Sequence, residues 1–439
     1  MIMALIPKIF LEKYIQLGSD DLMKFLEYSF AKQIALTMDR IYQNGLTTTS
    51  GGNISVCDKH GNIFISPSGV DKGKLEEQDI MKISPNGQII GKHKPSVEFP
   101  FHQHIYQVRS DIKAIVHAHP PGLVALSAAR KNPMTHLIGA VKNLIPHTTF
   151  APYALPGSKD LGENIANEFM KGFNVVLMEN HGIVIGAKNL QEAFLIMEVL
   201  EHYVLTEIKA LSVKSQFTQF PEFHYKPYAL KHYEEKSVIS KDIMDEFIYL
   251  VKRAYRLKLI SGYYGVFSLR VSEHAFLITP HQMDLNDIDI NDLVLVNNGK
   301  VPYGKYPDQA WTMHADIYDK NKDINALIQT ASIHSMVYTI TTNSFDTRII
   351  PEGYIMLKEI RKCLPESYLD IIDISKQRPV TLVQNNFVLV AGKTLFQAFD
   401  RLEVLEFGAN SLLMASQYEH IFQINDDEIK LIDNSFNAW

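Results

Sequence analysis

The sequence predicts an α/β fold in which helices are layered on a largely antiparallel sheet, and it predicts that this fold is present twice. Blocks of similar sequence recur in the same order in the two halves of the chain. Within each half, helical patterns are mixed with strand patterns, and some strand patterns follow one another too closely for the crossover helices of a parallel sheet. The length of 439 residues fits two or three domains of about 150 residues each.

The repeat is clearest where DIKAIVHAHPPGLVALS, from Asp111, pairs with DINALIQTASIHSMVYT, from Asp323, at an offset of 212 residues. FHQHIYQVRSD pairs with MHADIYDKNKD at the same offset, and FISPSGVDKGKLEEQDIMKI pairs with LITPHQMDLNDIDINDLVLV at an offset of 213. Later, NHGIVIGAKNLQEAFLIMEVLE, from Asn180, pairs with NNFVLVAGKTLFQAFDRLEVLE, from Asn385, at an offset of 205. Chance could match one pair of apolar strands, but it does not explain four pairs in unchanged order.

The elements are predicted in the same order in both halves. A helix comes first, at residues 22–44 and 240–257, and alternating runs such as GNISVCD and GVFSLRV then predict strands. A second helix follows Pro95 and Pro307, ahead of the apolar strand that contains VHAH in the first half. Near the end, an apolar strand (NVVLM, TLVQN) leads to an amphipathic helix. Its N-cap and the partner three residues on are Asn189 with Glu192, and Thr394 with Gln397.

These blocks divide the chain into three segments. Residues 1–211 are expected to form the first domain, here called copy one, and residues 237–439 the second, called copy two. The segment between them, 212–236, is the expected linker, because it contains Pro221, Pro227 and many polar or aromatic residues.

Composition narrows the class of protein. Hydrophobic residues make up 46% and charged residues 21%, which is typical of globular domains with real cores. The net charge is −6 and no long basic block occurs, so nucleic-acid or anionic-membrane binding has no electrostatic support. No run of about 18 apolar residues predicts a membrane span. The charged opening segment, MIMALIPKIFLEKYIQLGSDD, does not read as a signal peptide. With only Cys57 and Cys363, a cytoplasmic location is the default.

Two histidines share one side of the apolar strand in copy one. His117 and His119 are two residues apart, so their side chains point the same way. His181 ends another apolar strand, in ENHG, and Glu98 lies in or just before the helix that precedes the histidine strand. An isolated HxH is more often a pair of core histidines. Three histidines with an open position and a nearby carboxylate instead resemble a catalytic metal centre.

Copy two acts as an internal control for this interpretation. All four chemical residues are lost together, while the apolar positions around them persist. Packing histidines would be expected to survive in a scattered way, whereas concerted loss fits a site that works as a unit. The residues at the equivalent positions are Gln329, Ala331, Asn386 and Ala310, for His117, His119, His181 and Glu98 respectively.

Two loops in copy one, TTTSGGNIS and ISPSGVDKG, are rich in glycine and hydroxyl residues. Such loops can present backbone N–H groups and short side chains to a phosphate or another small anion. Each is also compatible with an ordinary hairpin turn. Copy two has lost this chemistry as well, since it carries Val266 in place of Asn53, and His281-Gln282 in place of Ser68-Gly69.

In combination, SGGNIS, ISPSGVDKGKL, KPSVEFPFHQHIY, VHAHP, APYALPGSKDL and ENHGIVIG resemble the class II aldolase/adducin family, over most of residues 25–210. L-fuculose-phosphate aldolase belongs to that family. The resemblance implies an α-β-α layered, class II aldolase-like domain with a largely antiparallel central sheet. Copy one would be its catalytic, metal-binding form, and copy two a degenerate form without the metal and acid/base residues, as in the non-catalytic adducin members.

The resemblance also implies roles for individual residues. His117, His119 and His181 would bind a divalent metal, commonly Zn²⁺, although Fe²⁺ or Mn²⁺ also suit such ligands. Glu98 would be the general acid/base in an aldol cleavage or condensation that passes through a metal-stabilised enediolate. The substrate would be a phosphorylated sugar or a related hydroxyketone. Its phosphate would lie against Asn53, Ser68, Gly69 and Ser96.

Two departures from the family pattern widen the choice of reaction. The second serine of the phosphate pocket is Val97 here, and the proton-donating tyrosine aligns near Leu137 or Ile138. A metal-dependent epimerase, dehydratase, decarboxylase or oxygenase therefore stays an alternative, as does an adducin-like assembly module. Family members tend to form fourfold rings, which implies a homo-oligomer. Two chains would then form a pseudo-tetramer in which copy two replaces a neighbour, unless copy two is only a stabilising partner domain.

Overall fold

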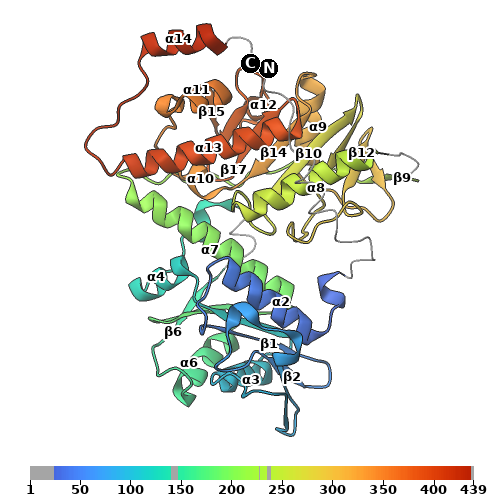
Figure 1. Cartoon of the computed structure of the whole chain (residues 1–439), viewed down its shortest axis with the longest axis vertical. Helices are drawn as coiled ribbons and strands as arrows, with labels where there is room; N and C mark the ends of the chain where they lie inside the picture. The colour runs from blue at the N-terminus through green and yellow to red at the C-terminus, as the bar shows by residue number, and fades with distance from the viewer. Residues whose placement is uncertain (1–23, 140–146, 227, 235–238, 437–439) are drawn as a thin grey trace.

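The computed structural model describes residues 24–139, 147–226, 228–234 and 239–436. Two sheets, each covered by helices, form two bodies joined by one long helix (Figure 1). The predicted α/β class is therefore confirmed. The opening segment, residues 1–21, is not expected to be a signal peptide and lies outside the described residues. No helix in the described ranges combines the length and apolar character needed to cross a bilayer.

The sheet of copy one has eight strands among the described residues, in the order β4-β3-β2-β1-β5-β8-β7-β6. All neighbours are antiparallel except β6 and β7, so the expectation of a largely antiparallel sheet is confirmed. The strands are β1 (Asn53–Cys57), β2 (Ile63–Ile65), β3 (Met81–Ile83), β4 (Ile89–Ile90), β5 (Ala114–Ala118), β6 (Thr149–Ala151), β7 (Val175–Met178) and β8 (Gly182–Ala187).

Helices cover both faces of this sheet. One face packs against α3 and α6, and the other against α2, α4 and α7, which gives the expected α-β-α layers. Successive residues of β5 alternate between these two cores, as a strand requires. The helices are η1 (Phe25–Glu27), α2 (Phe30–Gln43), η2 (Lys72–Lys74), η3 (Glu77–Asp79), α3 (Phe99–Val108), α4 (Pro121–Ala129), η4 (Thr135–Leu137), α6 (Lys159–Met170) and α7 (Leu190–Ser212).

Copy two repeats the central strand order and adds a strand from the connecting segment. Its described sheet runs β15-β16-β17-β14-β10-β11-β12-β13-β9, in which only β15·β16 and β13·β9 are parallel. The strands are β9 (Lys231–Tyr233), β10 (Gly265–Ser272), β11 (Ala275–Ile278), β12 (Val294–Asn297), β13 (Lys300–Pro302), β14 (Ala326–Thr330), β15 (Ile360–Cys363), β16 (Val380–Val383) and β17 (Phe387–Gly392).

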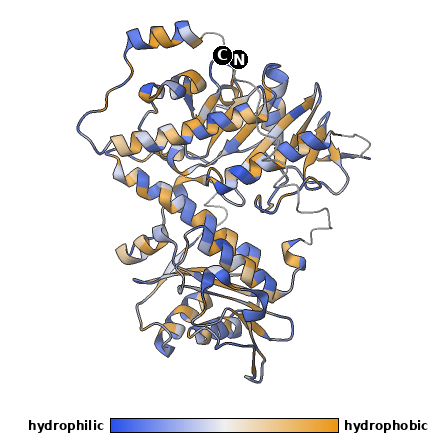
Figure 2. Ribbon diagram, in the orientation of Figure 1, coloured by the Kyte–Doolittle hydropathy of each residue, from blue (hydrophilic) through white to orange (hydrophobic). Residues whose placement is uncertain are grey.

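The helices of copy two follow the same plan, with one more at the end. Figure 2 shows α8 and α13 striped with hydrophilic and hydrophobic residues, as expected of helices with one face in the core. They are α8 (Lys241–Arg256), α9 (Trp311–Lys320), α10 (Ile333–Ile340), η5 (Thr347–Ile349), α11 (Pro351–Leu357), α12 (Tyr368–Ile371), α13 (Leu395–Ala415) and α14 (Asp426–Phe436).

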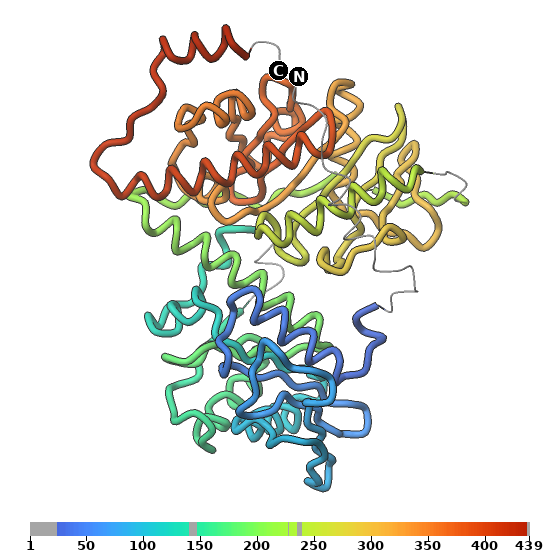
Figure 3. The backbone as a smooth tube through the Cα atoms, viewed as in Figure 1, coloured from blue at the N-terminus to red at the C-terminus, as the bar shows by residue number. Residues whose placement is uncertain are grey.

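The two copies pack against each other through α7. Figure 3 traces the chain from copy one (blue to green) along α7 into copy two (yellow to red). Helix α7 contacts α2 and α4 of its own copy and α10 of copy two, and one continuous apolar core includes residues of both copies, such as Leu195 and Phe267. The described residues of the segment 212–236 are attached to copy two as well, since they supply β9 and bury Phe223 in its core.

Most predicted boundaries agree with the structure. The N-caps of α7 and α13 are confirmed, because Asn189 accepts a hydrogen bond from the Glu192 N–H and Thr394 accepts one from the Gln397 N–H. The first helix differs from the prediction, since α2 begins only after its cap Ser29 and is preceded by the short η1. A second strand, β8 or β17, also lies between each apolar strand and its amphipathic helix.

Candidate active site

The histidine strand β5 lies at the centre of the sheet, between β1 and β8. In this register His117 is opposite Asn53 on one side and Val184 on the other. The His117 side chain is fully buried, and its Nδ1 is 3.0 Å from the carbonyl oxygen of Ile183. A hydrogen bond at Nδ1 leaves Nε2 to face the site, which is how metal-binding histidines are commonly oriented.

His119 and His181 meet His117 from two neighbouring turns. His119 follows the last residue of β5, and its Nε2 is 3.2 Å from Nε2 of His117. His181 lies in the β7–β8 turn, directly after Asn180, whose φ of 55° makes the turn tight. One ligand atom from each of the three imidazoles lies within 4.8 Å of the others.

Two glycines leave room for the His119 ring. A Cβ at Gly51 would come within 2.8 Å of its Nδ1, and a Cβ at Gly182 within 2.6 Å of its Cδ2. Real Cβ atoms do not approach so closely, so a larger residue at either position would displace the ring. The beginning of β8 and the loop before β1 therefore form a cradle for His119.

Glu98 approaches the histidines from the N-cap position of α3. The carboxylate is 6% exposed, and its Oε2 lies 3.2 Å from Nε2 of His117 and accepts a 2.7 Å hydrogen bond from the Asn53 amide. Its other oxygen, Oε1, is 3.7 Å from Nε2 of His181 and is buried without a hydrogen-bond partner. One oxygen is thus anchored, while the other faces the histidines.

The environment holds these groups in the forms that bind metal. Burial, followed by the nearby His117 and His181 imidazoles, lowers the pKa of His119 to about 3, and burial with His117 also lowers the pKa of His181. Burial alone would raise the pKa of Glu98, but His117 and the hydrogen bonds from His117 and Asn53 outweigh it and hold that pKa well below its usual range. His119 and His181 are therefore neutral imidazoles beside a carboxylate, and such groups can ligate a divalent cation without first losing protons.

The geometry fits a single divalent ion. Nitrogen ligands about 2.1 Å from a tetrahedral zinc lie about 3.4 Å apart, and the two closest nitrogens here are 3.2 Å apart. Three histidine ligands leave a fourth position open for substrate or water. The unpartnered Oε1 of Glu98 faces the same space. Among the described residues, His117, His119 and His181 are the only group of this kind close enough to share an ion.

A buried hydrogen-bonded chain supports Asn53 from behind. The oxygen of Asn53 bonds to Nε2 of His102, whose Nδ1 is 2.7 Å from the Ser55 hydroxyl, which in turn is 2.8 Å from the Tyr106 hydroxyl. Burial lowers the pKa of His102 to about 3, so the ring is neutral and can donate at one nitrogen while it accepts at the other. His102 was not identified from the sequence as part of this site.

The four predicted phosphate-binding residues lie on adjacent segments. Asn53 and Ser96 both contact Glu98. The Asn53 amide donates to the Glu98 carboxylate, and the Ser96 hydroxyl accepts a 3.3 Å hydrogen bond from the Glu98 N–H. The loop that carries Ser68 and Gly69 is joined to the Ser96 segment, since the Ser68 N–H donates to the Lys94 carbonyl. Their role in binding phosphate stays a prediction.

Lys72 links the two glycine-rich loops and was not identified from the sequence. It is 3% exposed, its ammonium donates to the Pro67 carbonyl at 2.6 Å, and its backbone N–H donates to the Thr49 carbonyl. Burial lowers the pKa of Lys72 to about 8. The signal was present in the repeat, because copy two has Leu285 at this position.

The residues that depart from the family pattern do not supply the missing groups. Leu137 and Ile138 are buried apolar side chains at 1% and 2% exposure. Val97 and Tyr153 are largely exposed, and the Tyr153 N–H bonds to the Glu179 carboxylate. Within the described residues of copy one, no tyrosine hydroxyl is recorded in contact with the histidines or Glu98.

Copy two keeps the frame of this site without its ligands. Gln329 is opposite Val266 in the sheet, as His117 is opposite Asn53, and Asn385 has a φ of 58° where Asn180 has 55°. The buried Ala310 and Ala331 replace Glu98 and His119. The alignment of the two halves therefore corresponds to equivalent positions in three dimensions.

Comparison with known proteins agrees with the fold. The family model described as Class II Aldolase and Adducin N-terminal domain matches residues 32–208 and 245–413. The chain is 33% identical over 186 residues to an L-fuculose phosphate aldolase of Methanococcus maripaludis, covering 41% of this chain and 98% of that protein. It is 35% identical over 167 residues to a 3-oxo-tetronate 4-phosphate decarboxylase of Pectobacterium atrosepticum, covering 36% and 75%.

A solved L-fuculose 1-phosphate aldolase shares 34% identity with this chain and covers 42% of it, with 85% of the solved chain matched and a TM-score of 0.38. The family model matches both halves, which together are well over half of the sequence. The chain belongs to the class II aldolase and adducin N-terminal domain family, and it carries that domain twice.

Proposed function

We propose that copy one is a metal-dependent lyase that cleaves or forms a carbon–carbon bond in a phosphorylated sugar or a related hydroxyketone. The observation that carries the proposal is the group of His117, His119 and His181, whose ligand atoms lie within 4.8 Å of one another beside a buried carboxylate. The similar proteins support this class of reaction, because their names describe an aldolase and a decarboxylase of phosphorylated compounds.

In this proposal the three histidines hold the cation, with Zn²⁺ expected first and Fe²⁺ or Mn²⁺ as alternatives. When bound, the cation supplies a Lewis acid for the carbonyl and adjacent hydroxyl oxygens of the substrate. The hydrogen bond between His117 Nδ1 and the Ile183 carbonyl supports this role, because it directs Nε2 towards the site.

Glu98 is the proposed acid/base residue. Its low pKa keeps it as a carboxylate, the form that accepts a proton from the substrate, although a pKa near neutrality would make it a stronger base. The Asn53 amide fixes Oε2, so the unpartnered Oε1 is the oxygen free for proton transfer. Asn53, Ser68, Gly69 and Ser96 are the proposed phosphate pocket, and the Lys72 ammonium behind the Pro67 carbonyl adds positive charge to it.

Decarboxylation is a second candidate reaction. It is favoured by the similarity to the 3-oxo-tetronate 4-phosphate decarboxylase and by the apolar residues Leu137 and Ile138 at the tyrosine position. Loss of CO₂ beside a carbonyl leaves the same kind of negative charge as retro-aldol cleavage, so the cation would assist both. Epimerisation, dehydration and oxygenation use parts of the same arrangement, and an adducin-like assembly role needs none of it.

Metal content tests the proposal first. Elemental mass spectrometry of the purified protein is expected to find one zinc, iron or manganese ion per chain, and none in His117→Ala/His119→Ala. A screen of ketose phosphates for retro-aldol cleavage, with 3-oxo acid phosphates screened for release of CO₂, then separates the two candidate reactions. A chain that binds no metal after reconstitution with divalent ions would refute the enzyme proposal and favour the assembly role.

We further propose that two chains form a ring of four domains, so that a second chain completes the metal site. Within one chain, Arg40 of copy one pairs with Asp284 of copy two and lies 3.6 Å from Glu198. Among the described residues, the ion pair of the equivalent Arg253 in copy two is with Glu403 of the same copy, and both side chains are partly exposed. A second chain would offer its Asp71, the equivalent of Asp284, to that Arg253.

The same symmetry argument applies to the site itself. The start of α7 from copy one lines the copy-two cavity that corresponds to the metal centre. By equivalence, the start of α13 would line the metal centre of a second chain, and Phe396 there is 48% exposed in the single chain. A fragment ending at residue 212 with full activity and an unchanged number of subunits would contradict this arrangement.

The finer bounds and the location are proposals of the same kind. We propose the bounds 1–211 for copy one, 212–236 for the connecting segment and 237–439 for copy two. Nucleic acids and membranes are not proposed as partners. Cys57 and Cys363 are both free thiols, which supports a cytoplasmic location.

A further inference from the structure

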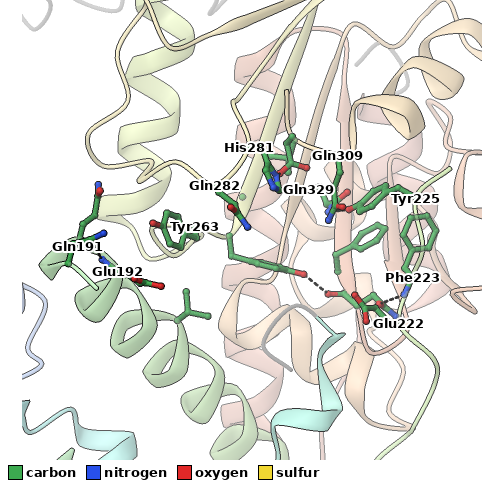
Figure 4. Close-up of a pocket in the computed structure, with 18 of the residues that line it drawn as sticks. Gln191, Glu192, Glu222, Phe223, Tyr225, Tyr263, His281, Gln282, Gln309 and Gln329 are labelled. Atoms are coloured by element: carbon green, nitrogen blue, oxygen red, sulfur yellow. Dashed lines mark hydrogen bonds and ion pairs between the residues drawn. The ribbon is translucent and has the colours of Figure 1, made fainter. Parts of the chain in front are cut away.

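A cavity of about 480 Å³ lies in copy two, on the side that faces copy one. Its wall combines the start of α7, residues 222–225 of the connecting segment and several loops of copy two (Figure 4). Many lining residues occupy positions equivalent to residues of the candidate active site in copy one or beside it. They include Val266 for Asn53, His281 and Gln282 for Ser68 and Gly69, Asp308 for Ser96, Gln329 for His117 and Asn386 for His181.

Two acceptor atoms on opposite walls of the cavity have no hydrogen-bond partner. Gln329 is 5% exposed and donates from its amide nitrogen to the Tyr225 hydroxyl at 2.6 Å, while its Oε1 is buried and unpartnered. On α7, Oε2 of Glu192 is likewise buried and unpartnered. Leaving such an acceptor unsatisfied is unfavourable, because it has given up its hydrogen bonds to water. A molecule that donates hydrogen bonds to both walls would remove this cost.

The charge of the lining disfavours a phosphorylated ligand. Among the described lining residues, Glu192, Glu222 and Asp308 contribute three carboxylates, whereas Lys188 is the one lysine or arginine. That lysine lies 3.8 Å from Glu192, and His281 lies 3.8 Å from Asp308. A phosphate dianion would therefore face a net negative wall, in contrast to the pocket proposed in copy one.

The remaining lining groups suit a neutral molecule with several hydroxyl groups. Gln191, Gln282 and Gln309 add amides that both donate and accept, and Figure 4 shows Gln282, Gln309 and Gln329 on the side of the cavity opposite α7. Phe223, Phe387 and the neighbouring tyrosines add aromatic surface for C–H groups. A cavity of this volume is within the range of about 300–1,000 Å³ for small-molecule sites.

Copy two also keeps the internal support of a binding site. Ser268 joins Nδ1 of His314 at 2.8 Å and the Tyr318 hydroxyl at 2.7 Å, as Ser55 joins His102 and Tyr106 in copy one. This chain fixes β10, which lines the cavity with Gly265 and Val266, against α9, the helix that follows the lining residues Asp308 and Gln309. The histidine ligands have been replaced, but the frame that positions the wall has not.

We propose that copy two binds a neutral polyhydroxylated molecule of monosaccharide size in this cavity, without a metal ion. The ligand donates hydroxyl hydrogens to Gln329 Oε1 and Glu192 Oε2 and places its C–H face against the aromatic side chains. The inference does not depend on the reaction proposed for copy one. Its site is formed by both copies, so a polyol bound there contacts α7 and copy two together.

Saturation-transfer NMR and calorimetry on the full chain test this inference, with D-ribose, D-glucose, D-fructose and xylitol as probes. The phosphorylated and amino forms of the same sugars serve as comparisons. Measurements use the wild-type chain and His117→Ala/His119→Ala, in which copy one cannot hold metal. At least one neutral probe is expected to bind saturably, with the same affinity in both proteins and more tightly than its phosphorylated or amino form.

Two variants on opposite walls locate the site. Gln329→Leu is expected to weaken binding by about threefold to tenfold, as for one hydrogen bond between neutral groups, and Glu192→Ala by at least about tenfold. Glu163→Ala, on the exposed surface of α6, is the control and should leave binding unchanged. Absence of saturable binding, preference for the phosphorylated or amino forms, or binding lost only in the double histidine variant would each overturn the proposal.

Discussion

Single residues separate the two copies. Their strands, turns and buried serine–histidine–tyrosine chains are equivalent, so the chemical difference rests on a few side chains around one open space. Asn53 shows how one residue couples these parts, because its amide nitrogen holds Glu98 while its oxygen bonds to His102. In copy two, Val266 takes its place and the Nε2 of His314 is buried without a partner.

Glu98→Gln should separate metal binding from proton transfer. The amide keeps the size and the contact with Asn53 but cannot accept a proton, so turnover is expected to fall by at least about 100-fold. Metal content should stay at one ion per chain, because three histidine ligands remain. Steady-state kinetics on the substrate found by the screen, combined with elemental analysis, checks this. Unchanged turnover would assign proton transfer to another group.

His314 provides a prediction of pH dependence. Burial lowers its pKa to about 3, whereas a histidine in the unfolded chain has a pKa of about 6.5. The unfolded chain therefore binds more protons between these values, so the contribution is present above about pH 6.5 and is lost as the pH falls towards 3. Between pH 7 and pH 5, the free energy of unfolding should fall by about 2 kcal/mol less in His314→Gln than in the wild type. Urea unfolding at both pH values measures the difference, and equal losses would contradict it.

The repeat explains which site residues could be predicted from sequence. The three histidines and Glu98 were identifiable because copy two lacks all four, and the structure brings them together, although their roles have still to be tested. His102 was missed for the opposite reason. Both copies keep this histidine, so comparison of the halves does not distinguish it from a packing residue. Its hydrogen bond to Asn53 depends on strand pairing that no local pattern shows.

At the scale of elements, a helix cap can be predicted when it comes from an adjacent residue, but not when it comes from a residue distant in the sequence. The N-caps of α7 and α13 could be predicted because cap and helix are adjacent in sequence. The cap of α4 comes instead from Glu201 on α7, whose carboxylate accepts hydrogen bonds from the Gly122 and Leu123 N–H groups. Glu406 on α13 caps α10 in the same way. Here a residue 79 positions away replaces the local signal.

Glu201→Gln should destabilise copy one through this tertiary cap. The variant keeps one acceptor oxygen but loses the other and the charge, so the free energy of unfolding is expected to fall by about 1–2 kcal/mol. Glu406→Gln should have a similar effect in copy two. Glu163→Gln is the matched control, since its pair with Lys159 is exposed and contributes under about 0.5 kcal/mol. Chemical denaturation measures all three, and equal effects of Glu201→Gln and Glu163→Gln would refute the capping role.

At the scale of the whole molecule, a buried ion network joins the copies. Arg40 bonds to both oxygens of Asp284 and to the Tyr255 hydroxyl, while Glu198 accepts from Tyr255 and from the Gly262 N–H. The repeat predicted two domains from sequence, but it could not predict this interface. In the sequence, Arg40 and Glu198 look like charged residues on the exposed faces of two helices. They are buried only because α2 and α7 pack on copy two.

Arg40→Met should therefore weaken the contact between copies. It leaves the carboxylates of Asp284 and Glu198 buried without their cation, a change that typically costs about 3–5 kcal/mol. Arg378→Met is the control, because its ion pair with Glu359 is exposed and only a small loss is expected. Thermal unfolding should show a lower or split transition for Arg40→Met alone. Equal shifts in both variants would mean that the network adds little to this interface.

In the proposed ring, Arg253 has the role between two chains that Arg40 has between the two copies of one chain. In the ring, copy one of a second chain packs against α8 and α13, in the way that copy two of the same chain packs against α2 and α7. Arg253 then meets an aspartate across that contact, and Phe396 approaches the partner's metal centre. Arg253→Glu with Phe396→Asp should then convert a dimer into single chains in light-scattering measurements. Metal content should stay at one ion per chain, because all three histidines belong to one chain, while turnover should fall with the dimer. A wild-type chain that is monomeric and fully active, or a variant that stays dimeric, would show that copy two serves only as a stabilising partner within its own chain.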